Sequence, residues 1–169
     1  EKYSKEKIAH LYSVSPERVD PGRQDWDQKN TPRLFAGLDA QATEQTREFY
    51  SSFCENLVEV SSPEVAEAAK LFENTFRQVN IALVNEFAEI SNALGISVYE
   101  IIDAAATKPY GFMKFSPSAG VGGHCIPIDP TYLAQAALEK GVKATFIERA
   151  NEVNLAMPKY VVNRVLADN

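Results

Sequence analysis

Apolar and polar positions alternate differently in the two parts of the chain. Short apolar runs at residues 10–15, 33–38 and 56–61 predict strands, and the segment 15–32 between the first two is a loop rich in Pro, Gly, Asp and Asn. From Asp39 the apolar spacing changes to that of a helix. The order strand, helix, strand predicts a parallel βα unit, although three short strands make a thin sheet for a whole domain.

Residues 62–95 carry one continuous helical pattern. Ser62 is suited to the N-cap, Pro63 to the first helical position and Gly95 to the C-terminal stop. Apolar residues recur at Val65, Ala68, Ala69, Phe72, Phe76, Val79, Leu83, Phe87 and Ile90. Such a helix is much longer than the average in globular proteins. We therefore expect it to bury a face against a partner subunit or to form the spine of a domain.

The remaining residues predict further helices around a long loop. Capping-box pairs stand at Ser97 with Glu100 and at Thr145 with Glu148. We expect helices over 97–107, 130–140 and 144–169, the last kinked or divided by Pro158, and a loop over 108–129. Long loops without secondary structure are often functional. The whole is a mainly helical α+β chain, in which the end of an α/β domain precedes an all-helical one.

Composition narrows the possible functions. Hydrophobic residues make up 45% and charged residues 24% of the 169 residues, as in ordinary soluble domains. The net charge of −6 argues against non-specific nucleic-acid binding. No apolar run reaches the ~18 residues of a membrane helix, and residues 1–9 show no signal-peptide pattern, so we expect a cytoplasmic protein without membrane association. Two cysteines and two histidines without metal-ligand spacing predict no metal site.

Cys125 is the strongest candidate for chemistry. It follows Gly120, Gly122 and Gly123, which allow a backbone to approach a ligand closely and can present N–H groups to an oxyanion. A thiolate in such surroundings is a good nucleophile. The alternative is a small buried cysteine in a glycine turn.

Other polar residues have a structural and a functional interpretation. Asp129 fits the N-cap of the helix that Pro130 opens, yet it lies four residues after Cys125. Lys70 and Asn74 share a helix face beside an apolar seam; they form either a pocket wall or a solvated lysine and a satisfied core asparagine. Glu17 stands in a loop after a strand, where α/β proteins bind ligands.

Three segments together point to a family. SPERVDPG (15–22), AAKLFENTFRQVNIALVNEFAEI (68–90) and GVGGHCIPIDP (120–130) resemble, in order and spacing, the UDP-glucose/GDP-mannose dehydrogenase family. The first and third most resemble its branch that oxidises UDP-N-acetylhexosamines such as UDP-N-acetylmannosamine. The resemblance implies a cytoplasmic homodimer that uses NAD and supplies precursors of surface polysaccharides.

The same resemblance implies a domain layout. Residues 1–61 match the end of the NAD-binding Rossmann-like domain. Residues 62–157 match a 6-phosphogluconate-dehydrogenase-like central dimerisation domain, with helix 63–94 at the dimer interface, and residues 158–169 lead toward a nucleotide-sugar domain. No GxGxxG follows a strand, so the main NAD fingerprint is absent from these residues. We expect a fragment that does not turn over substrate alone.

The resemblance also implies roles for the candidate residues. Cys125 matches the nucleophile of a four-electron oxidation of the C6 alcohol through a thiohemiacetal and a thioester. Lys70 and Asn74 match the pair that stabilises the oxyanion, Asp129 the aspartate that helps activate water, and Glu17 the acid/base residue of thioester hydrolysis. The family's second acidic residue in this loop has no clear counterpart, because Asp20 and Pro21 occupy its place. The substrate-binding residues would be Gly120, Gly122, Gly123, Lys108, Lys114 and Phe115.

Two other functions stay open. One is a two-electron NAD dehydrogenase with a similar helical domain, which would not need Cys125. The other is a helical dimerisation module without catalysis.

Overall fold

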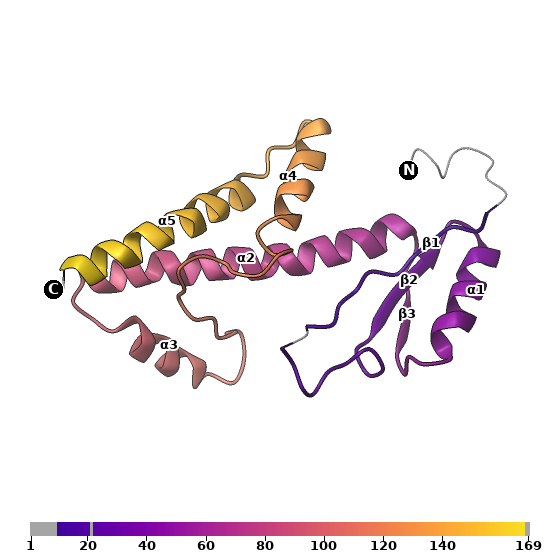
Figure 1. Cartoon of the computed structure of the whole chain (residues 1–169), viewed down its shortest axis with the longest axis horizontal. Helices are drawn as coiled ribbons and strands as arrows, with labels where there is room; N and C mark the ends of the chain where they lie inside the picture. Colours follow the sequence, from indigo (N-terminus) through magenta and orange to yellow (C-terminus); the bar gives the residue numbers. More distant parts are fainter. Residues whose placement is uncertain (1–9, 21, 168–169) are drawn as a thin grey trace. The chain divides into compact units, whose positions relative to one another are not determined.

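The computed structural model describes residues 10–20 and 22–167 (Figure 1). Packing divides the chain into two units between Leu71 and Phe72, and each is described by itself. Residues 1–9, whose pattern suggested a cytoplasmic protein, and Pro21 lie outside the described residues. Within the described segments, none of the helices combines the length and the apolar composition of a membrane span.

The first unit is a three-stranded sheet with one helix. Its elements are β1 (Ser13–Val14), β2 (Arg33–Gly37), α1 (Ala40–Ser51) and β3 (Leu57–Glu59), and the strand order is β1-β2-β3. The predicted βα unit is confirmed, since β2 and β3 are parallel with Leu34 opposite Val58; β1 pairs antiparallel to β2. The strands are shorter than the apolar runs that predicted them.

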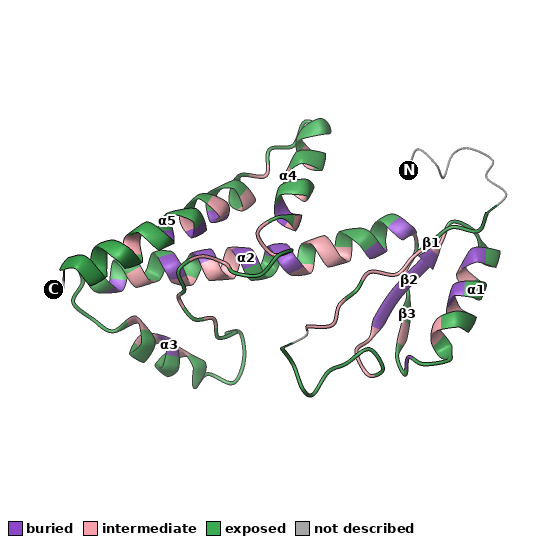
Figure 2. Ribbon diagram, viewed as in Figure 1, coloured by how far each residue is buried: buried purple, intermediate pink, exposed green. Residues whose placement is uncertain are grey.

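The core of this unit lies on β2. Four of its five residues are buried, and Phe35 is fully so (Figure 2). Asp39 caps α1 by accepting a hydrogen bond from the N–H of Ala42. Gly37 lets the helix start directly after the strand, because an added Cβ would lie 2.4 Å from the backbone N of Thr43. The carboxyl end of β2 is therefore joined to α1 by a tight turn.

The long helix α2 (Pro63–Ala93) is confirmed, and the division between the units falls within it. Its burial is not that of an ordinary amphipathic helix. The buried residues on it include Asn74, Gln78, Asn85 and Ser91, whereas most of its large apolar side chains are exposed. The described residues thus leave the apolar face of α2 largely exposed, and they bury a mainly polar face of the helix.

The second unit adds three helices to the C-terminal part of α2. They are α3 (Val98–Ala106), α4 (Asp129–Glu139) and α5 (Thr145–Ala167). Ser97 caps α3 through the N–H of Glu100, as the capping box predicted. Helix α5 runs beside α2 (Figure 1), and buried asparagines on the two helices are hydrogen-bonded. Pro158 lies inside α5 without dividing it.

The fold class is confirmed as mainly helical α+β. The domain boundary that the sequence suggested, between residues 61 and 62, stays a prediction.

Candidate active site

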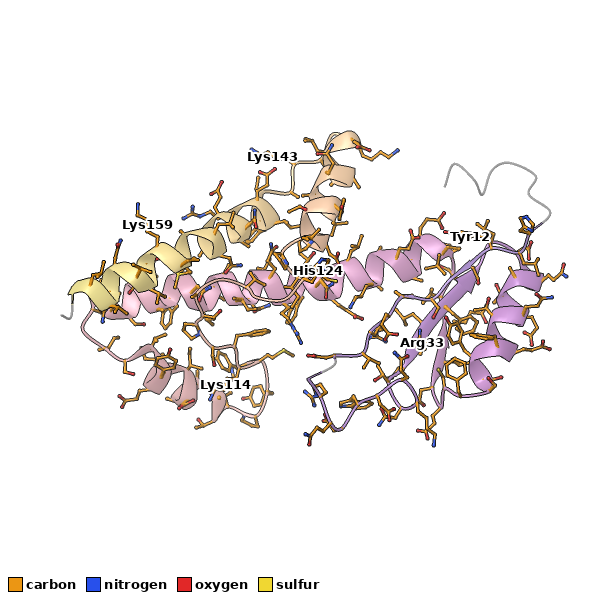
Figure 3. All side chains as sticks on the ribbon, viewed as in Figure 1. Tyr12, Arg33, Lys114, His124, Lys143 and Lys159 are labelled. Atoms are coloured by element: carbon orange, nitrogen blue, oxygen red, sulfur yellow. The ribbon has the colours of Figure 1, made fainter. Side chains whose placement is uncertain are left out.

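Cys125 lies in the turn that leads from the long loop into α4. Its carbonyl oxygen accepts hydrogen bonds from the N–H groups of Ile128 at 3.0 Å and Asp129 at 2.8 Å. The free thiol is exposed, which excludes the alternative of a buried structural cysteine. Nδ1 of the neighbouring His124, labelled in Figure 3, is 3.8 Å from Sγ. Cys125 is thus accessible to a ligand at the amino-terminal side of a helix.

Asp129 does not cap α4, contrary to the prediction. It is the first residue of the helix, Ile128 is the cap residue, and no side chain caps it. The Asp129 carboxylate instead accepts a hydrogen bond of 2.6 Å from Nδ2 of Asn74. Asn74 is buried on α2, so this bond fixes the start of α4 against α2. The structure thus brings together two of the predicted catalytic residues, Asn74 and Asp129. Asp129 lies four residues after Cys125 in the chain.

The glycines before Cys125 adopt backbone conformations that other residues avoid. Gly120, Gly122 and Gly123 have φ values of 114°, 67° and 76°. Side chains at these positions would strain the loop. The expectation that the segment needs glycine is supported by this geometry, while its contact with substrate stays a prediction.

A buried amide network holds the beginning of this loop. Asn85 on α2 accepts a 2.8 Å hydrogen bond from the N–H of Ser118 and donates one of 2.9 Å to Oδ1 of Asn154 on α5. Asn154 in turn donates to the carbonyl oxygen of Gln78 at 3.2 Å. The sequence patterns did not predict this network. The available signal was an asparagine in the middle of each of two helices, where that residue is unfavourable unless it is bonded.

The predicted substrate-binding residues of the loop are spread along it. Lys108 lies with Nζ 5.1 Å from the centre of the Tyr110 ring, and Lys114 is paired with Asp103. Phe115 packs edge-on against Phe76 of α2, with ring centres 6.0 Å apart. The loop is therefore attached to α2 by Phe115, and Lys114 would have to leave Asp103 to meet a diphosphate.

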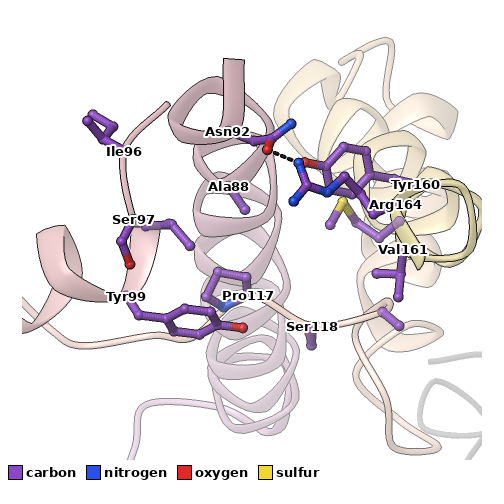
Figure 4. A pocket seen from close by; sticks show the side chains of 13 residues that line it. Ala88, Asn92, Ile96, Ser97, Tyr99, Pro117, Ser118, Tyr160, Val161 and Arg164 are labelled. Carbon is purple, nitrogen blue, oxygen red and sulfur yellow. Dashed lines mark hydrogen bonds between the residues drawn. The ribbon is translucent and has the colours of Figure 1, made fainter. Parts of the chain in front are cut away.

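A cavity of about 510 Å³ opens beside residues 117–119 of the loop, and Cys125 is not among the residues that line it (Figure 4). It is lined by residues from α2, the start of α3, residues 117–119 and α5. Tyr99 and Tyr160 face it, and Arg164 donates a hydrogen bond to Asn92 at its edge. No predicted site residue lines this cavity. The cavity and the candidate site share the long loop, because Ser118, which lines the cavity, donates its N–H to Asn85 and stands before Cys125 in that loop.

Glu17 and Lys70 belong to the first unit, so their proximity to Cys125 stays a prediction. Lys70 lies one helical turn before Asn74 on α2 and is half-buried; within the described residues its ammonium has no ion pair. Glu17 is held by four hydrogen bonds. Burial raises its pKa, but the bonds from the Val19 amide, Gln28, Arg33 and the Arg18 amide outweigh that effect and lower the pKa to about 2.

Known proteins resemble this chain over almost its whole length. UDP-N-acetyl-D-mannosamine dehydrogenase of Methanococcus vannielii is 39% identical over 161 residues, which are 95% of this chain and 36% of that protein. NDP-N-acetyl-D-galactosaminuronic acid dehydrogenase of Ralstonia nicotianae is 38% identical over 94% of this chain and 36% of its own length. The chain thus spans about 36% of these relatives.

A solved structure has the same fold. UDP-D-ManNAc dehydrogenase of Pyrococcus horikoshii superposes with a TM-score of 0.84 at 33% identity, covering 96% of this chain and 38% of that one. The model of the central domain of the UDP-glucose/GDP-mannose dehydrogenase family matches residues 64–156. This match includes α2 from its second residue onward, the glycine-rich loop, Cys125 and Asp129. The chain belongs to the UDP-glucose/GDP-mannose dehydrogenase family.

Proposed function

We propose that the longer protein containing this chain oxidises the C6 alcohol of a UDP-N-acetylhexosamine, with UDP-N-acetylmannosamine the first choice, to a carboxylate through a covalent bond to Cys125. The observation that carries the proposal is an exposed free thiol four residues before an aspartate held by a buried amide. The names of the relatives support the substrate class, and they include both mannosamine and galactosamine derivatives.

The chemistry explains why a cysteine is needed. Loss of a hydride and a proton converts the alcohol to an aldehyde, and Sγ of Cys125 adds to its carbonyl carbon to form a thiohemiacetal. A second loss of hydride and proton leaves a thioester. Water then adds to the thioester carbon, the C–S bond breaks, and Cys125 departs as a thiolate while the sugar leaves as a carboxylate. The covalent bond keeps the half-oxidised carbon in the site between the two oxidations.

Three polar residues would assist the steps in which negative charge develops on the oxygen of the reacting carbon or in which water attacks: Asn74, Lys70 and Asp129. The Asn74 amide has two N–H groups and uses one on Asp129, so the other can donate to the oxygen on the reacting carbon. Lys70, on the same helix face, would add positive charge to that oxyanion. Asp129, fixed at one carboxylate oxygen, can orient water with the other. Each role uses an atom that the described contacts leave available.

NAD supplies the hydride acceptor for both oxidations. The described residues do not fit the main part of its site, because β2 and α1 are joined at Gly37 without the run of glycines that places a pyrophosphate on a helix N-terminus. We therefore assign no residue of this chain to the dinucleotide.

The proposal is tested by counting NADH formed per nucleotide sugar consumed, with the full-length protein and a panel of UDP- and GDP-sugars. We expect two NADH for one sugar and loss of this product in Cys125→Ala and Cys125→Ser. One NADH per sugar with an active Cys125→Ala variant would favour a two-electron dehydrogenase. A folded protein without turnover on any sugar would favour a non-catalytic module.

We also propose that two copies associate through helix 63–94. Phe72, Leu83 and Ile90 are 67%, 60% and 46% exposed, and their spacing places them on one stripe of α2. Burying this stripe against its copy would remove the largest uncovered apolar surface of the helix from water. Leu83→Glu should lower the mass measured by light scattering to that of a monomer while the helical circular dichroism is kept. Glu89→Ala, at an exposed position off the stripe, is the control; unchanged mass in Leu83→Glu would refute this interface.

A further inference from the structure

The surroundings of Glu17 suggest how its predicted reaction step is controlled. We propose that Arg33 is the fixed anchor that positions the Glu17 carboxylate, and that Gln28 is a releasable donor that blocks it as a base until the side chain swings away. The proposal rests on the proposed function and on the role that the family resemblance implies for Glu17, which is to assist hydrolysis of the thioester on Cys125. It also names the residues that assist Glu17, for which the family's second acidic residue has no clear counterpart in the sequence.

All acceptor positions of Glu17 are filled. Oε1 accepts the N–H groups of Arg18 and Val19, both at 2.7 Å. Oε2 accepts Nε2 of Gln28 at 2.9 Å and Nη2 of Arg33 at 3.0 Å. A carboxylate offers about four lone-pair sites, and here each of four donors takes one. Glu17 thus has no lone pair left for a proton from water, and its low pKa agrees with this geometry.

One donor must therefore leave before Glu17 can act as a general base. The two backbone N–H groups are held by the chain next to Glu17 itself. Arg33 is the first residue of β2, and its side chain is only 8% exposed. It also contacts Ser15 Oγ at 3.4 Å and stacks on the ring of Tyr50, with Cζ 4.8 Å from the ring centre. Separation of a buried guanidinium from its carboxylate partner has a large free-energy cost, because it leaves a buried charge without its partner.

Gln28 can leave without moving the loop. The side chain of Gln28 is neutral, and the residue is exposed. Its backbone carbonyl oxygen accepts a hydrogen bond of 3.4 Å from the Cys54 thiol, which holds the main chain in place. The next residue is held as well, since the Lys29 carbonyl accepts the N–H of Glu55 at 2.8 Å. The Gln28 side chain has two hydrogen bonds here, because its Oε1 also accepts Nη2 of Arg33 at 2.5 Å. Rotation of this side chain alone would break both bonds and expose Glu17 and Arg33 to water. That rotation frees one lone pair of Oε2 while Arg33 keeps the carboxylate in place.

Substitutions of Gln28 and of Arg33 should therefore change the rate of thioester hydrolysis in opposite directions. In Gln28→Ala the carboxylate has a free lone pair and a higher proton affinity, so thioester hydrolysis should be about threefold faster or more. In Arg33→Ala the carboxylate loses its anchor, so hydrolysis should slow and the acylated enzyme should accumulate. Arg33→Lys should recover part of the rate, because charge is kept but the planar fork is lost.

The experiment is a single-turnover reaction of the full-length enzyme with the nucleotide sugar that it oxidises and NAD. Quenched samples are analysed for the mass of the acyl group on the Cys125 peptide, and its decay gives the hydrolysis rate. Gln24→Ala is the matched control, an exposed glutamine of the same loop that is expected to hydrolyse the thioester at the parent rate. The first burst of NADH, which does not use Glu17, shows that each variant is folded.

The outcomes separate the two proposals. Faster decay in Gln28→Ala together with slower decay in Arg33→Ala supports the anchor and the releasable donor. Equal rates in Gln28→Ala, Gln24→Ala and the parent, or slower decay in Gln28→Ala, would overturn this inference while the acylated Cys125 still supported the proposed function. If the parent forms NADH without any acyl group on Cys125, the proposed function itself fails.

Discussion

Substitution of Asn154 by alanine probes the buried amide network that holds the loop before Cys125. The change removes hydrogen bonds of 2.9 Å to Asn85 and 3.2 Å to the Gln78 carbonyl, each worth about 1 kcal/mol. It also leaves the Asn85 amide N–H groups buried without this partner, at a further cost of about 1–3 kcal/mol. Alanine returns roughly 0.5 kcal/mol through its helix propensity. The free energy of unfolding should therefore fall by about 2.5–4.5 kcal/mol.

Two measurements check this prediction. Denaturant unfolding of the 169-residue chain gives the loss of stability, with Asn163→Ala, an exposed asparagine of the same helix, as control within about 0.5 kcal/mol of the parent. Hydrogen exchange at Ser118 gives the local effect, because the Asn85 oxygen that accepts this N–H is no longer held from α5. If Asn154→Ala behaved like Asn163→Ala in both measurements, the network would not hold the loop.

Three more predictions concern single positions. Phe35→Ala removes the fully buried ring of β2 and leaves a cavity in the core of the first unit. The free energy of unfolding, measured in denaturant, should fall by about 3–5 kcal/mol, and a loss below about 1 kcal/mol would refute this view of the core. Gly122→Ala meets no neighbouring atom but has a φ of 67°, so about 1 kcal/mol of backbone strain should lower the melting temperature, and an unchanged melting temperature would contradict the described loop. The pKa of Glu17 is lowered from 4.5 to about 2, so the ionised carboxylate stabilises the fold fully above pH 4.5 and this stabilisation is lost as the pH falls toward 2. Because the side chain is half-exposed, its contribution is on the order of 1 kcal/mol. The free energy of unfolding of Glu17→Gln should therefore fall less than that of the parent over this pH range.

The local elements could be predicted from the sequence because their signals are local. The cap of α3 at Ser97, the start of α2 at Pro63 and the βα unit each depend on residues that stand next to one another in the chain. The order and spacing of three motifs also carried the family resemblance that the comparisons confirm. These features required no knowledge of which helix packs on which.

The long-range polar contacts could not be predicted in this way. Asn85 and Asn154 are far apart in the sequence, and so are Glu17 and Arg33. The periodicity of α2 indicated an apolar face, yet the face that packs within the chain is the polar one. Asp129 fits a cap by every local rule, but a partner on α2 takes its carboxylate instead. In each case tertiary packing decided between two uses of the same side chain.

The proposed role of Cys125 is to carry the substrate between two oxidations. The most direct test is the mass of the peptide containing Cys125, after the full-length enzyme is mixed with nucleotide sugar and NAD and quenched during the first turnover. We expect a transient acyl group on Cys125 that appears with the second NADH and disappears as the carboxylate is released. Formation of two NADH per sugar with an unmodified Cys125 at every time point would contradict it.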